Sequence, residues 1–178
     1  TARVLFKATG VAPRDSERRP GLEFSPALDL LHHVRFLPLL TSRGCPYRCA
    51  YCASKRLVPS FVRRPVDEVL REIGSARISY GITDIALYDD AFLLNPADHA
   101  MPLLEAAASE FPGLRWHTPN GLHASAIDIT VAGVMKRAGF ETIRIGLESS
   151  SDDFHRGTGR KTDFASFVTA VRNLQDAG

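Results

Sequence analysis

Residues 36–52 read FLPLLTSRGCPYRCAYC, a short apolar run that leads directly into three closely spaced cysteines. Cys45, Cys49 and Cys52 have the spacing C-x3-C-x2-C, with glycine and proline on either side of the first, as expected for a loop after a strand. Three thiolates can bind three irons of a four-iron cluster and leave the fourth iron without a protein ligand. An open iron can bind a small molecule, so this spacing favours a catalytic cluster.

The three cysteines could also form a zinc site or a disulfide. A closed zinc site usually has four ligands, and His32, His33 or a more distant histidine would have to supply the fourth. An odd, tightly clustered set of cysteines is a poor disulfide framework. Reduced cysteines are typical of a reducing compartment, so we expect a cytoplasmic protein. Ligand count and spacing together favour an iron–sulfur cluster over zinc.

The rest of the chain alternates apolar runs with segments of helical period. Such strand–helix units in succession indicate a parallel sheet with right-handed crossovers. A complete eightfold barrel takes about 250 residues, whereas this chain has 178. The predicted fold class is therefore α/β, a partial parallel (β/α) barrel of about four strand–helix units. The predicted strands are residues 36–41, 82–88, 114–117 and 142–147, and the predicted helices are residues 65–78, 96–111, 126–138 and 164–177.

Two parts of the chain differ in regularity. Residues 1–35 have no clean period and predict an irregular N-terminal arm or linker with a short helix near 27–32, whereas residues 36–178 predict the barrel core. Asn95 is expected to cap the second helix and Gly139 to close the third.

Composition excludes some classes of protein. Hydrophobic residues make up 44% of the chain and charged residues 24%, as in ordinary globular proteins. The net charge of +2 is too small to indicate nucleic-acid binding by itself. No apolar run reaches the length of about 18 residues that a membrane-spanning helix needs, so we expect no membrane partner.

Polar side chains follow the predicted strands. Asp89 and Asp90 follow the second strand, Asn120 follows the third, and Glu148 and Ser149 follow the fourth. Because the carboxyl ends of parallel strands meet at one edge of a barrel, we expect these side chains to line a common site. Each also has a structural explanation, since aspartate and Asn-Gly favour turns and Ser and Glu are common where helices begin.

The motif C-x3-C-x-aromatic-C, with Tyr51 as the aromatic residue, resembles the signature of radical S-adenosylmethionine (SAM) enzymes. The resemblance extends from about Leu37 to Gly178. It implies that the three cysteines bind a [4Fe–4S] cluster whose open iron holds SAM. The reduced cluster would then cleave SAM to a 5′-deoxyadenosyl radical that abstracts hydrogen from a substrate, which the resemblance leaves unnamed. It also implies an electron donor such as a flavodoxin or ferredoxin.

The same resemblance gives roles to the residues at the strand ends. Asp89 or Asp90 would accept hydrogen bonds from the SAM amino group. Glu148 and Ser149 would contact the SAM ribose hydroxyls or carboxylate, since a carboxylate accepts from two hydroxyls well. Tyr51, next to the last cysteine, joins the expected cofactor-binding residues.

Two further residues are less tightly assigned. Asn120 lies in a segment that resembles the third-strand end of those family members that often carry a cobalamin domain. Cobalamin would then be held by a domain outside this chain, upstream of Thr1. Arg144, expected inside the fourth strand, would pair with the SAM carboxylate or an acid of the second strand, or would face a helix outside the barrel.

The core of the family that this chain resembles usually has more strand–helix units than the four predicted here. We therefore expect the parent chain to continue beyond Gly178 with an apolar strand, and the exposed sheet edge after the fourth strand to allow self-association. The leading hypothesis is a radical SAM core, with methyl or methylthio transfer as candidate reactions. The alternative is a non-catalytic structural module that binds zinc or an iron–sulfur cluster.

Overall fold

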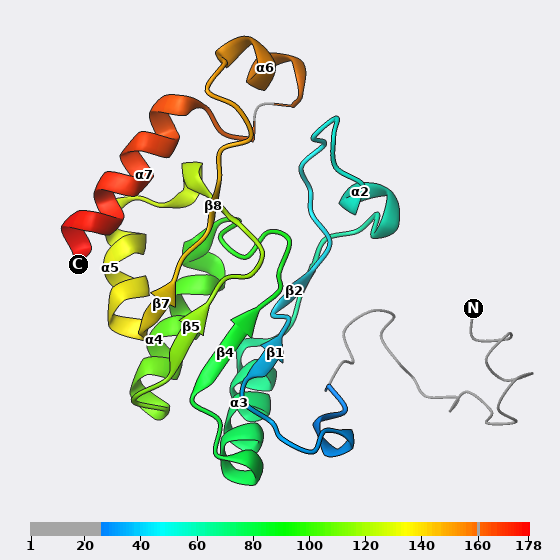
Figure 1. Cartoon of the computed structure of the whole chain (residues 1–178), viewed down its shortest axis with the longest axis vertical. Coiled ribbons are helices and arrows are strands. Elements are labelled where there is room, and N and C mark those ends of the chain that lie inside the picture. The colour runs from blue at the N-terminus through cyan, green and yellow to red at the C-terminus, as the bar shows by residue number, and fades with distance from the viewer. Residues whose placement is uncertain (1–25, 160) are drawn as a thin grey trace, which may run out of the picture.

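A computed structural model describes residues 26–159 and 161–178 (Figure 1). Most of the predicted N-terminal arm therefore lies outside the described residues. Its described part contains one short 3-10 helix, η1 (Leu28–Leu30), inside the range where the sequence predicts a short helix. Among the described residues, no helix is both long and apolar enough to cross a membrane.

The core is a four-stranded sheet in which all strand pairs are parallel. Its strands are β1 (Leu37–Leu39), β4 (Asp84–Leu87), β5 (Arg115–His117) and β7 (Phe140–Thr142), and their order in the sheet follows their order in the chain. This arrangement confirms the predicted parallel α/β fold, an incomplete barrel built from successive strand–helix units. Pro38 is tolerated in β1 because β1 is an edge strand.

Four helices connect or follow these strands. They are α3 (Val66–Tyr80), α4 (Ala100–Glu110), α5 (Ile129–Ala138) and α7 (Phe164–Ala177), and each packs against the next along the chain. Figure 1 shows α3 and α4 behind the sheet, with α5 and α7 continuing past β7.

Side-chain alternation along the strands divides the sheet into two faces. Leu37, Ile85, Leu87 and Trp116 are almost fully buried and join the apolar core that the helices cover. The indole of Trp116 stacks on Phe140, with ring centroids 5.9 Å apart. The intervening residues of the same strands point to the other face, which in a closed barrel is the interior.

The predicted fourth strand, residues 142–147, is wrong in its extent. The backbone instead forms β7 and a separate β8 (Ile145–Gly146), which pairs with β6 (Leu122–His123) in a two-stranded parallel ladder. Arg144 lies between the two strands rather than inside one. Its backbone N–H donates to the Thr118 hydroxyl at 2.8 Å, so this donor is not available to the main sheet.

Two predicted helix starts also need correction. Asn95 does not cap a helix: it has φ 41°, its side chain makes no capping hydrogen bond, and a 3-10 turn, η2 (Pro96–Asp98), precedes α4. The third helix begins at Ile129, because Asp128 accepts a hydrogen bond from the backbone N–H of Val131 and so supplies the cap. Ala126, where that helix was expected to start, is instead the last residue of a 3-10 turn, η3 (Ala124–Ala126).

We predict different costs for alanine at the two glycines that end α3 and α5. Gly81 and Gly139 both have positive φ, 66° and 89° respectively, and close their helices in the left-handed conformation. A Cβ at Gly139 would lie 2.3 Å from the carbonyl oxygen of Leu114, whereas a Cβ at Gly81 would meet nothing within 4 Å. Gly81→Ala should cost about 1 kcal/mol from backbone strain alone, and Gly139→Ala a further 1–3 kcal/mol or so from overpacking.

Urea unfolding of the two variants beside the parent protein measures this difference. Equal losses of unfolding free energy would show that the close approach of Gly139 to Leu114, the residue before β5, is not a constraint on the fold.

Candidate functional site

The cysteine loop rises from the carboxyl end of β1. Directly after β1, β2 (Ser42–Arg43) pairs antiparallel with β3 (Val62–Arg63) and forms a short two-stranded base. The loop between them carries all three cysteines and a single helical turn, α2 (Ser54–Leu57). Figure 1 shows this loop extending beyond the sheet at the edge where β1 and β4 end.

Gly44 is required where the loop leaves β2. Its φ is +81°, and a Cβ there would lie 2.3 Å from the carbonyl oxygen of Ser60. The two arms of the loop therefore approach each other through backbone alone. This contact restricts the backbone path into Cys45, the next residue.

The three cysteines are free thiols with graded exposure. Cys45 is buried, Cys49 is half-buried and Cys52 is exposed. Burial raises the pKa of the Cys45 thiol, and negative charge on Asp90, Cys49 and Cys52 adds to the rise. Ionising all three neighbouring thiols is therefore unfavourable unless a positively charged partner binds beside them.

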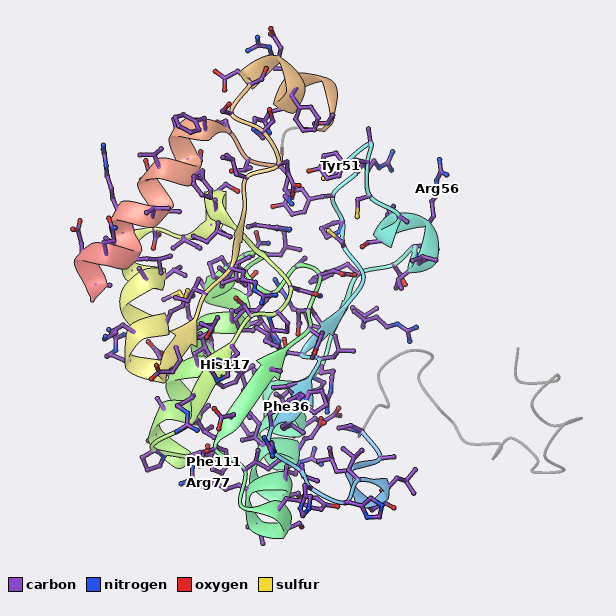
Figure 2. All side chains as sticks on the ribbon, in the orientation of Figure 1. Phe36, Tyr51, Arg56, Arg77, Phe111 and His117 are labelled. Carbon is purple, nitrogen blue, oxygen red and sulfur yellow. The ribbon has the colours of Figure 1, made fainter. Side chains whose placement is uncertain are left out.

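The α6 segment (Asp152–Gly157) packs on the cysteine loop. The backbone N–H of Ala50 donates to the carbonyl oxygen of Thr158 at 3.1 Å. Tyr51 stacks on Phe154 with ring centroids 5.9 Å apart, and Figure 2 shows Tyr51 between the loop and α6. Burial raises the pKa of the Tyr51 phenol, and a hydrogen bond with Cys49 adds to the rise. Tyr51 thus lies beside a cysteine and anchors the loop to a segment about 100 residues away.

The two predicted aspartates occupy different environments. Asp89 is buried, and its carboxylate accepts hydrogen bonds from the backbone N–H of Thr41 at 2.9 Å, from the Thr41 hydroxyl at 2.8 Å and from the Ser42 hydroxyl. Burial raises the pKa of Asp89, and these hydrogen bonds oppose that rise. Asp90 is exposed and close enough for its charge to act on Cys45. Asp90 is therefore the freer of the two to contact a bound molecule.

Asn120 and Arg144 lie farther from the cysteines. The Asn120 amide donates to the carbonyl oxygen of Tyr88 at 2.7 Å and ties the end of β5 to the end of β4. The Arg144 guanidinium donates to the carbonyl oxygen of Pro119 at 3.1 Å. Arg144 also lines a cavity of about 400 Å³ together with Asp84 and His117.

That cavity lies on the sheet face opposite the main helices. Phe36, Asp84, Ala86 and His117 alternate with the buried core residues along the strands and line its wall. Figure 2 shows Phe36 and His117 in front of the sheet. Arg144 therefore faces the barrel interior and not an outer helix, the alternative that the sequence left open.

Glu148 has an unusual backbone. Its φ is 69°, a left-handed conformation that costs a non-glycine residue energy and that often marks a functional site. Its carboxylate pairs with the ammonium of Lys161 at 3.0 Å, and both side chains are largely shielded from solvent. The Ser149 hydroxyl accepts a hydrogen bond from the backbone N–H of Ser151, and the Ser149 carbonyl accepts one from His155. Ser149 therefore shapes the turn before α6.

Two residues outside the predicted site set lie near both Glu148 and Tyr47 of the cysteine loop. His123 is 6% exposed and packs edge-on against Tyr47, with ring centroids 4.6 Å apart. Burial and the Lys161 charge lower the pKa of His123 to about 4, so its imidazole is neutral. Its Nδ1 is buried without a hydrogen-bond partner among the described residues. His123 follows the third predicted strand, as Asn120 does, but only the fold brings it near Lys161.

The site thus gathers only part of the predicted set. Asp90 and Tyr51 lie within electrostatic reach of the cysteine thiols, and Glu148 lies within reach of the Tyr51 phenol. Asp89 and Ser149 are engaged by their own chain. Asn120 and Arg144 shape the strand ends and the inner cavity.

Among curated proteins, the chain is 28% identical over 146 residues to an uncharacterized methyltransferase of Pyrococcus horikoshii, covering 82% of this chain and 31% of that protein. It is 32% identical over 112 residues to the cytidylyl-2-hydroxyethylphosphonate methyltransferase of Streptomyces wedmorensis, covering 62% of this chain and 20% of that protein. The chain therefore spans a third or less of the length of these two relatives.

Two solved structures share the fold. The radical SAM methyltransferase TsrM from Kitasatospora setae, with tryptophan substrate and a SAM analogue bound, has a TM-score of 0.68 at 23% identity, over 81% of this chain and 29% of that chain. The cobalamin-dependent radical SAM enzyme OxsB, with aqua-cobalamin bound, has a TM-score of 0.68 at 22% identity, over 80% of this chain and 22% of that chain.

A family profile identifies the fold more specifically than these structures do. The profile of the radical SAM superfamily matches residues 39–178, which include the whole cysteine loop and every strand end described above. The chain therefore belongs to the radical SAM superfamily.

Proposed function

We propose that this chain is the cluster-binding and SAM-binding core of a radical SAM methyltransferase. The observation that carries the proposal is the cysteine loop: Cys45, Cys49 and Cys52 are free thiols at the carboxyl end of β1, the edge where parallel α/β barrels hold their active sites. Both curated relatives are named methyltransferases, which supports methyl transfer as the reaction.

The donor set fits a four-iron cluster. In such a cluster each thiolate binds its own iron, so the sulfurs need not converge on one point. Within the part of the chain that the structure describes, no three His, Cys, Asp or Glu side chains converge on a single ion. The three thiols are nevertheless close enough for charge on Cys49 and Cys52 to raise the pKa of Cys45. Three neighbouring thiols match a cluster that takes three cysteine ligands, whereas a closed zinc site, the structural alternative, would need a fourth ligand.

The residues beside the loop also suit SAM. His123 carries a buried Nδ1 without a protein partner in the described chain, which indicates a polar ligand at this position. Glu148 offers a carboxylate to ribose hydroxyls, and Lys161 beside it offers a cation to a carboxylate. Asp90, exposed near Cys45, can accept from an ammonium. These groups match the polar parts of SAM.

The protein contributes orientation and shielding. Cys45, Cys49 and Cys52 would hold the four-iron cluster, whose chemistry when bound and reduced would be one-electron cleavage of SAM into methionine and a 5′-deoxyadenosyl radical. Tyr51 and Phe154 cover the loop from the α6 side. The neutral His123 ring and Tyr47 fill the space between the loop and β6, which helps to exclude water.

We place the substrate in the inner cavity of about 400 Å³, a volume suited to a small molecule. Its polar lining includes Arg144, Asp84 and His117, and Phe36 and Tyr88 contribute aromatic rings. In the proposed enzyme, cobalamin is held by a domain outside this chain. The fold shared with OxsB, whose structure contains aqua-cobalamin, supports that part of the proposal.

The wider setting of the proposal follows from the chemistry. Free thiols and an oxygen-sensitive cluster require a reducing compartment such as the cytoplasm. An electron donor such as a flavodoxin or ferredoxin would reduce the cluster. The β7 edge has no strand beside it among the described residues, so a further strand or a second copy of the chain can pair there.

Replacing the cysteines tests the cluster. Anaerobic reconstitution of the protein with iron and sulfide should give a brown protein with about four irons per chain. Cys45→Ala, Cys49→Ala and Cys52→Ala should each lose most of this iron, because each removes a ligand to a different iron. Iron analysis and electron paramagnetic resonance (EPR) of the reduced protein measure this. A colourless protein that binds one zinc tightly through all three cysteines would contradict the proposal.

Replacing Glu148 tests the SAM site separately from the cluster. Glu148→Gln keeps the size of the side chain but removes the charge, so we expect SAM to bind on the order of tenfold more weakly. The iron content should stay unchanged. The concentration of SAM needed to alter the EPR spectrum of the reduced cluster reports this affinity.

Glu141→Gln is the matched control, because Glu141 is exposed on β7 and away from the site. Equal SAM affinities in the Glu148 and Glu141 variants would exclude Glu148 from the SAM site.

A further inference from the structure

We propose that Asp89 is a positioning residue for the cysteine loop and that its buried carboxylate sets where Cys45 lies. This inference deepens the proposed function and rests on it, since the loop is taken to hold the cluster. It also gives Asp89 a different role from the SAM contact that the resemblance implies.

The first support is the set of hydrogen bonds that Asp89 accepts. Asp89 is 4% exposed and lies just beyond β4. One carboxylate oxygen accepts from the backbone N–H of Thr41 at 2.9 Å, and the other accepts from the hydroxyls of Thr41, at 2.8 Å, and Ser42. Three donors on two consecutive residues therefore fix both the backbone and the side chains at the base of the loop.

The second support is a clamp on the other side of the same segment. The Thr41 carbonyl oxygen accepts from the backbone N–H of Arg64 at 2.9 Å, and the Arg64 guanidinium donates to the Leu40 carbonyl oxygen at 2.8 Å. Glu72 of α3 pairs with that guanidinium at 2.6 Å, and both side chains are almost completely shielded from solvent. Thr41 is thus held between Asp89 on one side and Arg64 on the other.

The third support is the short distance along the chain from this clamp to the first cysteine. Only Arg43 and Gly44 separate Ser42 from Cys45, and Cys45 is itself 8% exposed. With so few rotatable bonds between them, a shift of Thr41 and Ser42 must move Cys45. Residues that hold metal ligands in place in this way commonly control how well the ligands bind.

A buried carboxylate is an energetically unfavourable group for a purely structural hydrogen-bonding role. Burying a charged group among neutral donors carries a desolvation penalty that a neutral amide or hydroxyl would largely avoid. The penalty is offset here by three hydrogen bonds to one loop base, which gives that base a single defined geometry.

The test compares Asp89→Asn with Asp84→Asn. Asp84 is the first residue of β4, whereas Asp89 lies beyond its other end. Asp84 accepts hydrogen bonds from Arg115 at 2.8 Å and Thr83 at 2.9 Å, away from the loop. The first readout uses protein without a cluster: the rate at which iodoacetamide labels each cysteine, followed by mass spectrometry. Iodoacetamide should label Cys45 about tenfold faster in Asp89→Asn than in the parent protein, because the loss of a hydrogen bond to the carboxylate loosens the base of the loop.

The labelling rate of Cys52 and the Cys45 rate in Asp84→Asn show whether the effect is specific to the base of the loop. Cys52 is already exposed and should label at the parent rate in every variant. Asp84→Asn should leave the Cys45 rate unchanged even where thermal unfolding shows lost stability. A parent-like Cys45 rate in Asp89→Asn, or an equal acceleration in Asp84→Asn, would overturn the proposal.

A second variant covers the case in which Asp89→Asn does not fold. Ser42→Ala removes one donor and keeps the carboxylate with its two bonds to Thr41, so it should accelerate Cys45 labelling to a smaller extent. In that case an unchanged rate in Ser42→Ala overturns the proposal.

Reconstituted protein supplies the second readout. The EPR g-values of the reduced cluster should shift in Asp89→Asn and stay fixed in Asp84→Asn. If the parent protein takes up no cluster while Asp89→Asn still exposes Cys45, the positioning role stands and the proposed function fails.

Discussion

The parallel pairing of β1 with β4 is the constraint on which the site depends. Leu37 lies opposite Ile85 and Leu39 opposite Leu87, and the Tyr88 N–H continues the ladder by donating to the Leu39 carbonyl at 2.9 Å. In this register both strands end at the same level. The cysteine loop and the two aspartates after β4 therefore emerge side by side, although about 40 residues separate them in the chain.

Much of this fold could be predicted from the sequence because its signals are local. Each helix has an apolar stripe, each strand is a short apolar run, and Gly139 ends its helix in the left-handed conformation. The errors lie where tertiary contacts compete. The fourth strand is interrupted because residues 145–146 pair with β6, whereas residues 140–142 pair with β5. No local sequence pattern predicts this division.

The site shows the same split between local and distant information. The spacing of Cys45, Cys49 and Cys52 lies within one loop, so the sequence reveals it directly. Asp89 also follows a strand, but its partners are 47 and 48 residues away, and only the register of two strands brings them together. His123 ends the short strand β6 and Lys161 lies between α6 and α7, so that only the entire fold brings them together.

The graded exposure of the three cysteines has a consequence for the lifetime of the protein in air. Cys52 lies at the surface while Cys45 is enclosed, so oxidants reach the outer rim of the loop first. Damage then begins at one corner and spares the buried thiol, which keeps its place beside the sheet. If these thiols hold the proposed cluster, its outermost ligand, Cys52, would be oxidised first and the enclosed Cys45 last.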